Sequence, residues 1–224
     1  MAATATPIHR WLWYECCRVC LRLPATLAFH LQYTGQQNIP LEGPVVVVAN
    51  HQSHLDPALV GCGIPRQLHF VARDTLFGFT PFAKLMLSLN AIPIDREGGG
   101  LAGLKETLRR LKRGEMVLLF PEGTRTRDGR IGPFRPGFTT LAVRGRAAVL
   151  PVAIEGAYCA WPRRRRLPWV ATIHVHYAQP LSAAEVACFA ERELLREVEG
   201  RVRACHEMLC GRPVLARQGR RHWG

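Results

Sequence analysis

The chain has 224 residues, of which 48% are hydrophobic and 21% are charged. This length suits one sizeable α/β core rather than two, and this composition excludes a chain that is disordered throughout. The 30 Lys and Arg residues outnumber the 17 Asp and Glu residues, which leaves a formal charge of +13, most of it from arginine. Such a charge favours a partner that carries phosphate: a nucleic acid, an anionic lipid or a phosphorylated substrate.

Residues 8–31 are rich in Trp, Leu and Phe, but charged residues interrupt them at Arg10, Glu15, Arg18 and Arg22. A helix that spans a membrane needs roughly 20 nearly uncharged apolar residues, so we do not expect this segment to cross one. Pro24 is expected to break it. Aromatic residues among regularly placed arginines are typical of helices that lie in a membrane interface, whereas the alternative is an amphipathic helix that packs on the protein's own core.

Strand and helix patterns alternate along the middle of the chain. Apolar runs predict strands at 44–50, 67–73, 91–95, 115–120, 147–154 and 170–178, and helical patterns occupy 76–90, 101–114 and 137–145. One long helix is expected over 182–211, where Ser182 and Glu185 form a capping box and Gly211 and Pro213 mark the stop. This alternation predicts an α/β fold with a mostly parallel sheet that helices cover. We divide the chain into interfacial helices (1–33), a catalytic domain (34–212) and a disordered basic tail (213–224).

The strand at 44–50 runs directly into a polar turn with His51 and Asp56. On a regular helix these two side chains would point in different directions, so they can pair only if the chain turns between them. A paired Asp56 would fix the imidazole tautomer and leave the other nitrogen of His51 as a general base. The alternative is that Ser53 and Asp56 only cap a helix. His54 is the rival base.

A second polar cluster, at 121–125, follows the strand at 115–120 and contains Glu122, Gly123, Thr124 and Arg125. Gly123 lets backbone N–H groups approach a ligand closely, and the Arg125 guanidinium matches the geometry of phosphate. Alone, this cluster could be a surface turn. Because ligands of parallel sheets gather at the strand ends, we interpret it as the phosphate half of a site whose base is His51.

Four blocks at 50–56, 92–97, 120–129 and 149–154 resemble the motifs of the glycerolipid acyltransferase family, in particular the bacterial 1-acylglycerol-3-phosphate acyltransferases. The resemblance runs from about Val45 to Gly156. It implies a glycerol-3-phosphate acyltransferase-like αβ sandwich with an N-terminal element of two amphipathic helices. It assigns catalysis to His51 and Asp56 and substrate binding to Arg96, Glu122, Gly123, Thr124 and Arg125, and it places Pro151 in the apolar fourth block.

The implied reaction is direct acyl transfer. His51 would take the proton of a glycerol hydroxyl as its oxygen attacks the thioester of acyl-CoA or acyl carrier protein. The acceptor would be 1-acylglycerol 3-phosphate and the product phosphatidate; another lysolipid or amino-lipid acceptor, or a non-catalytic lipid-binding relative, are the alternatives. We expect Arg96 and Arg125 to hold the acceptor phosphate, Glu122 to orient Arg125 or the acceptor, and backbone N–H groups near Gly123 to stabilise the oxyanion. No cofactor or metal is expected.

Four consecutive arginines, 163–166, lie between tryptophans at 161 and 169. Nucleic-acid binding is the competing interpretation, but no nucleic-acid-binding motif accompanies the run. We expect this loop to contact anionic lipid, or else to be simply solvated, and the enzyme to lie on the cytoplasmic face of the cell membrane as a peripheral or monotopic protein. The eight cysteines lack a second Cys-x-x-Cys half-site for zinc, and Cys62 is expected to fill core space.

Overall fold

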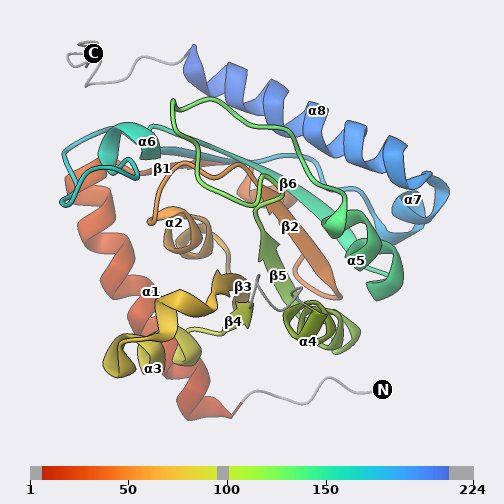
Figure 1. The fold of residues 1–224 in the computed structure, drawn as a ribbon, viewed down its shortest axis with the longest axis horizontal. Coiled ribbons are helices and arrows are strands. Elements are labelled where there is room, and N and C mark those ends of the chain that lie inside the picture. The colour runs from red at the N-terminus through yellow and green to blue at the C-terminus, as the bar shows by residue number, and fades with distance from the viewer. Residues whose placement is uncertain (1–6, 95–100, 212–224) are drawn as a thin grey trace.

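A computed structural model of the chain describes residues 7–94 and 101–211. Within them lies a sheet of seven strands in the order β1-β7-β6-β2-β5-β3-β4 (Figure 1). Neighbouring strands are parallel, except that β6 and β7 are antiparallel. The expected α/β class with a mostly parallel sheet is therefore confirmed. The strands are β1 Gln32–Thr34, β2 Val45–Ala49, β3 Leu68–Arg73, β4 Ala91–Ile94, β5 Met116–Leu119, β6 Ala148–Glu155 and β7 His174–Tyr177.

Helices cover both faces of this sheet (Figure 1). Residues of α1 and α2 join one apolar cluster, and residues of α4, α5, α7 and α8 join the other. Short 3-10 helices occupy Gln36–Asn38 and Asp74–Phe77. The α-helices are α1 Ile8–Phe29, α2 Asp56–Gly63, α3 Thr80–Ser88, α4 Leu101–Lys112, α5 Gly137–Gly145, α6 Ala157–Ala160, α7 Ala183–Cys188 and α8 Glu191–Cys210.

The four valines of β2 explain why this strand lies near the middle of the sheet, between β6 and β5. Successive side chains of a strand point to opposite faces, and all four valines are fully buried. Val45 and Val47 belong to the cluster under α1 and α2, whereas Val46 and Val48 belong to the other cluster. A strand that is apolar on both faces is fixed in the core, and its carboxyl end delivers the polar turn that follows.

The N-terminal element is a single helix in the structure, and the expected pair of helices is wrong. Helix α1 continues through Pro24 to Phe29. A proline inside a helix removes the hydrogen bond to the carbonyl of Cys20, and because Cys20 is exposed, water can take that bond. In the described residues, no helix is both long enough and apolar enough to cross a membrane. The division of the chain at residues 33 and 34 stays a prediction.

The C-terminal helix is also different from the prediction, because it consists of two helices. Phe189 and Ala190 are extended and separate α7 from α8. Ser182 and Glu185 form the expected capping box of α7. Helix α8 then starts separately. The Glu193 carboxylate accepts the backbone N–H of Ala190, and acidic residues stabilise the first turn of a helix. The stop at Gly211 was correct, whereas Pro213 and the tail lie outside the described residues.

Candidate active site

The polar turn between β2 and α2, residues 50–56, is called the catalytic turn below. Asn50 is the first residue of this turn, and its side chain bonds to the neighbouring strand β6. The Asn50 side-chain amide donates to the carbonyl of Ile154 (2.9 Å) and accepts the Ile154 N–H (2.8 Å). Both bonds are buried, so the turn starts from a defined position at the carboxyl end of the sheet.

Asp56 is the first residue of α2 and is fully buried. Its Oδ2 atom lies 2.7 Å from His51 Nδ1 and accepts the backbone N–H groups of Gln52 (2.6 Å) and Ser53 (2.7 Å). The two alternatives from the sequence are therefore both present: Asp56 pairs with His51 and also satisfies the backbone of the turn. Since this oxygen accepts every bond, Nδ1 of His51 carries the proton and Nε2 keeps its lone pair.

The ring of His51 is held from one side by an aromatic residue. Phe120, which follows β5, stacks on it with ring centroids 4.0 Å apart and an interplanar angle of 16°. The His51 side chain is 19% exposed, so part of it reaches the surface of the molecule. The orientation of the His51 ring thus depends on the hydrogen bond to Asp56 within the turn and on Phe120, which is nearly seventy residues away in the sequence.

Glu122 supports the same histidine through its backbone. One carboxylate oxygen accepts the N–H of His51 (2.7 Å) and the other accepts the N–H of Gly132 (2.9 Å). Burial raises the pKa of Glu122, and these two backbone donors and the nearby His51 oppose that rise. Both carboxylate oxygens of Glu122 therefore accept backbone N–H groups. Among the described residues, neither oxygen forms an ion pair with Arg125, the partner that the sequence suggested.

The rest of the second cluster lies beside the turn, joined to it by the Thr126 N–H, which donates to the His51 carbonyl (2.8 Å). Gly123 has a φ of 70°, which favours glycine, and its N–H donates to the carbonyl of Phe120 (3.0 Å). That N–H is therefore already occupied and is not free for an oxyanion. Thr124 is exposed. Arg125 is half-buried, and its buried Nη1 has no hydrogen-bond partner among the described residues. Arg96 lies outside the described residues.

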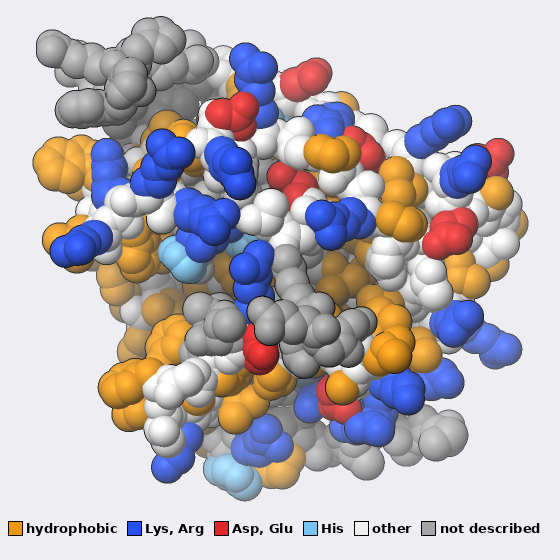
Figure 2. Space-filling model, viewed as in Figure 1, with side chains coloured by type: hydrophobic (Ala, Val, Ile, Leu, Met, Phe, Trp, Pro, Cys, Tyr) orange, Lys and Arg blue, Asp and Glu red, His pale blue; other side chains and the backbone are white. Residues whose placement is uncertain are grey.

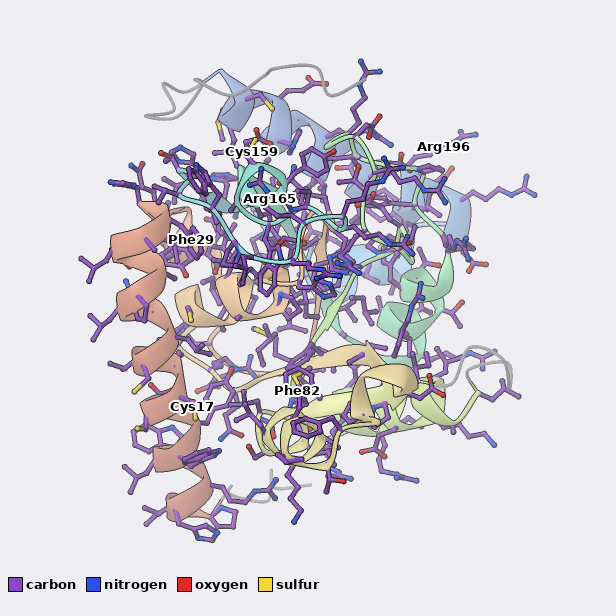
Figure 3. The ribbon with its side chains drawn as sticks, turned by 60° about the vertical axis from the view of Figure 1, so that its left-hand side comes forward. Cys17, Phe29, Phe82, Cys159, Arg165 and Arg196 are labelled. Carbon is purple, nitrogen blue, oxygen red and sulfur yellow. The ribbon has the colours of Figure 1, made fainter. Side chains whose placement is uncertain are left out.

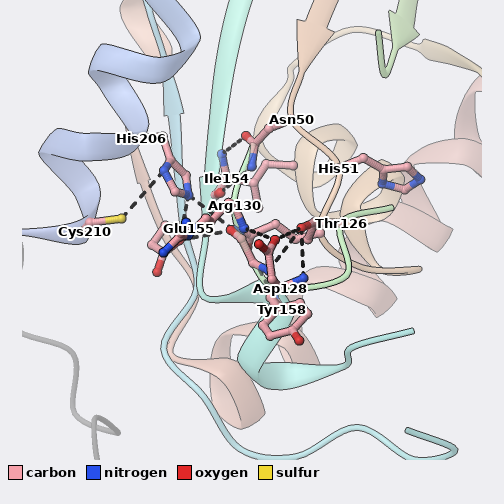
Figure 4. A network of polar contacts seen from close by, with 12 residues as sticks. Asn50, His51, Thr126, Asp128, Arg130, Ile154, Glu155, Tyr158, His206 and Cys210 are labelled. Carbon is pink, nitrogen blue, oxygen red and sulfur yellow. Dashed lines mark hydrogen bonds and ion pairs between the residues drawn. The ribbon is translucent and has the colours of Figure 1, made fainter. Parts of the chain in front are cut away.

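A network that the sequence did not suggest holds the side chain of Gln52 (Figure 4). Its Nε2 lies 3.2 Å from a carboxylate oxygen of Glu155, 3.3 Å from the ring of His206 and 3.3 Å from the carbonyl of Gly129. His206 belongs to α8 and contacts Glu155 at 2.8 Å. Burial acts to raise the pKa of Glu155, but its bonds to His206 and Gln52 lower it overall. The last helix therefore supports the catalytic turn.

The same network includes the group in the described residues that is best placed to share a metal ion. Glu155, His206 and Cys210 offer ligand atoms within 4.8 Å of one another. However, the imidazole of His206 uses Nε2 for Glu155 and turns Nδ1 toward the sulfur of Cys210, 3.7 Å away. As arranged, these side chains form a hydrogen-bonded chain in which His206 links a carboxylate to a thiol.

His54, the rival base, faces a different neighbour. It is exposed, and its ring lies 5.8 Å from that of Trp161 with an angle of 56° between the rings. Burial of part of its ring lowers its pKa, and the positive charges of Arg125 and Arg163 add to that effect. It lacks the short contact to Asp56 that His51 makes, so the geometry favours His51 as the base.

Comparisons with known proteins agree with this geometry. A family model described as "Acyltransferase" matches residues 30–155. The 1-acyl-sn-glycerol-3-phosphate acyltransferase of Bacillus subtilis is 31% identical over 144 residues, which cover 64% of this chain and 71% of that one. The Pseudomonas aeruginosa protein of the same name is 34% identical over 173 residues, covering 75% and 65% of the two chains. The crystal structure of the 1-acyl-sn-glycerophosphate (LPA) acyltransferase PlsC from Thermotoga maritima superposes with a TM-score of 0.81 at 27% identity, covering 91% of this chain and 82% of that one.

Proposed function

The chain belongs to the acyltransferase family, and on that premise we propose that it transfers an acyl group from a thioester to the free hydroxyl of 1-acylglycerol 3-phosphate. The product would be phosphatidate. The observation that carries this proposal is the 2.7 Å contact between His51 Nδ1 and Asp56, because it leaves Nε2 as a base at the open side of the ring. The names of the relatives supply the acceptor.

In this mechanism His51 Nε2 removes the hydroxyl proton as the acceptor oxygen attacks the thioester carbon. The new bond joins that oxygen to the acyl carbon, and the bond between carbon and sulfur breaks. The departing thiolate takes the proton from His51, so the enzyme returns to its starting state. Asp56 stabilises the imidazolium that exists in between, and no covalent acyl-enzyme is required. The donor is acyl-CoA or acyl carrier protein.

Arg125 is the proposed partner of the acceptor phosphate. Its buried Nη1 has no hydrogen-bond partner in the described part of the chain, and burial is the main reason that its pKa is lowered. A phosphate monoester would satisfy that N–H and offset the cost of burying the charge. Arg96 is proposed as a second phosphate ligand from the family resemblance alone.

We also propose that the enzyme lies on an anionic membrane surface, at the cytoplasmic face, without crossing it. Along α1 many apolar side chains are exposed and, in Figure 3, the helix lies along one edge of the molecule with many of its side chains directed away from the sheet. Helix α3 joins this edge, because the indole of Trp13 donates to Ser88 (3.0 Å). The exposed apolar residues of this edge are Ile8, Trp11, Leu12, Trp13, Val19, Leu21, Leu23 and Leu27 of α1 and Phe82, Leu85 and Leu87 of α3, with Phe79 just before it.

The first experiment is an assay of acyl transfer. The purified full chain would be incubated with labelled acyl-CoA and, separately, with lysophosphatidate, glycerol 3-phosphate or lysophosphatidylcholine in detergent micelles. We expect label in phosphatidate and little in the other products. Transfer to lysophosphatidylcholine in place of lysophosphatidate would replace the proposed acceptor, and transfer to none of them with either donor would favour a non-catalytic lipid-binding protein.

The second experiment tests the membrane proposal by vesicle flotation. The full chain should float with vesicles that contain anionic lipid and should stay bound in high salt, because the apolar part of the contact is not screened. Trp11→Ser combined with Leu27→Ser should make binding salt-sensitive. Val143→Ser, an exposed apolar residue of α5, is the control and should change nothing. Equal flotation of all three proteins in high salt would remove α1 from the membrane contact.

A further inference from the structure

The loop that carries the arginine run, residues 161–170, is attached to the catalytic turn and is called the arginine loop. The hydroxyl of Ser53 donates to the carbonyl of Trp161 (2.9 Å), and the Trp161 ring lies against His54. The loop is closed at its base, because the Trp169 N–H donates to the carbonyl of Ala160 (2.8 Å). The first residues of the loop are therefore held beside the site, whereas residues 163–170 are all exposed.

The charge of one member of the run reaches the site. Burial is the largest cause of the lowered pKa of Arg125, and the positive charge of Arg163 is the second. The charge of Arg73 also lowers this pKa, whereas the charge of Asp56 raises it. Arg163 also contributes to the lowered pKa of His54. In Figure 2 Lys and Arg side chains are numerous on the upper part of this face, and several lie beside a histidine. Arg163 is thus electrostatically part of the catalytic turn's surroundings.

Arg73 approaches from a third element. It is the last residue of β3 and lies opposite Ile94 of β4, so it stands at the carboxyl edge of the sheet, the edge where β2 delivers the catalytic turn. Arg73, Arg125 and Arg163 therefore come from three separate segments of the chain, and the charges of Arg73 and Arg163 both act on Arg125. Like charges in one region destabilise the fold unless an anion lies between them, and the buried Nη1 of Arg125 already lacks a partner.

We propose that Arg163 and Arg73 complete, with Arg125, the site for the phosphate group of the acceptor. This inference rests on the proposed function and narrows it: the arginine loop would serve substrate recognition through its first arginine and the membrane surface through the arginines that follow. A phosphate monoester carries up to two negative charges and several acceptor oxygens, so three cations suit it better than one. The phosphates of a CoA donor have the same chemistry, and the experiment separates the two sources.

The test compares Arg163→Gln with Arg164→Gln, which removes the same charge from the next position of the same loop. Both would be assayed in neutral detergent micelles, where no anionic surface is present. Arg163→Gln should raise the KM for lysophosphatidate about tenfold or more, the scale of a lost bond to a charged group. The KM for acyl-CoA should stay within about twofold, and Arg164→Gln should leave both values within that range, as surface substitutions usually do. Arg73→Gln should behave like Arg163→Gln.

Two further measurements keep the outcomes distinct. With monoacylglycerol, an acceptor without phosphate, Arg163→Gln should match the wild type; an equal loss there would overturn the proposal, and so would a raised KM for acyl-CoA alone. Glycerol 3-phosphate should raise the melting temperature of the wild type and of Arg164→Gln, but less that of Arg163→Gln. The shift in melting temperature needs no turnover, so it tests the arginine site even if the wild type transfers no acyl group. A lack of transfer by the wild type would contradict the proposed function but not the arginine site. Equal shifts in all three proteins would contradict the arginine site.

Discussion

Replacing Glu122 by Gln changes one atom of the carboxylate and no volume, so it isolates the role of this residue. The two oxygens of Glu122 accept the N–H groups of His51 (2.7 Å) and Gly132 (2.9 Å). A Gln side chain has one acceptor oxygen and one NH2 donor. Whichever way the amide is turned, one backbone N–H loses its acceptor and faces another donor.

The magnitude follows from the burial of the site, because Glu122 is only 8% exposed. Leaving a buried donor unsatisfied costs about 1–3 kcal/mol. For a chain of this size, about 2 kcal/mol corresponds to a fall of roughly 4–8 °C in the melting temperature. Displacing the backbone of His51 should also lower kcat by about tenfold or more, since a misplacement of the base by an ångström is costly.

The measurements are thermal unfolding followed by circular dichroism and kcat with lysophosphatidate. Glu42→Gln is the matched control, because Glu42 is exposed and should tolerate the same change. The melting temperature is informative even if the acceptor is a different lipid. If Glu122→Gln unfolded at the wild-type temperature with the wild-type kcat, the two backbone bonds would contribute nothing and our account of Glu122 would be refuted.

Three further predictions follow from contacts of histidines. His51→Ala should lower transfer by at least about 10²-fold while His54→Ala stays within about threefold, both folded by circular dichroism; the reverse order of activities would make His54 the base. His206→Ala should lower kcat about tenfold with little change in KM, because Glu155, the carboxylate that accepts from Gln52 beside the base, loses its bond to His206; an unchanged kcat would show that α8 does not support the turn. Burial and then Arg110 lower the pKa of His69 to about 4, from 6.5. The folded state therefore binds this proton less well than the unfolded state, so the free energy of unfolding should fall as the pH drops from 6.5 toward 4, by on the order of 3 kcal/mol at most. His69→Gln should flatten this part of the curve, and the same slope in both proteins would contradict the assignment.

The helix boundaries show where reading along the chain reaches its limit. The end of one predicted helix is simple to place when a proline or a capping residue marks it, as Ser182 does for α7. Pro24 is a breaker by its local chemistry, yet α1 continues through it. The break between α7 and α8 has no glycine or proline to announce it. In both cases exposure and packing, which are properties of the folded molecule, override a weak local preference.

The candidate site divides in the same way. His51, Asp56 and Glu122 are conspicuous because polar residues directly follow apolar strands. The supporting residues carry no such signal: Phe120 reads as the end of a strand and His206 as part of a helix face. Gln52 lies inside the catalytic turn and could have been chosen, but its partners are more than seventy residues away.

The sequence by itself predicted six of the seven strands and the burial of 45–48 on both faces, because hydrophobic periodicity is a local property, whereas the short edge strand β1 was not predicted. Four valines in a row require burial on both faces, and a separation of five residues allows His51 to reach Asp56 if the chain turns between them. The tertiary structure decided what surrounds that pair. Whether Glu122 bonds to the backbone of His51 or to Arg125 depends on how separate strand ends meet. The relative position of these strand ends is set by packing across the whole sheet, so it cannot be predicted from any single segment.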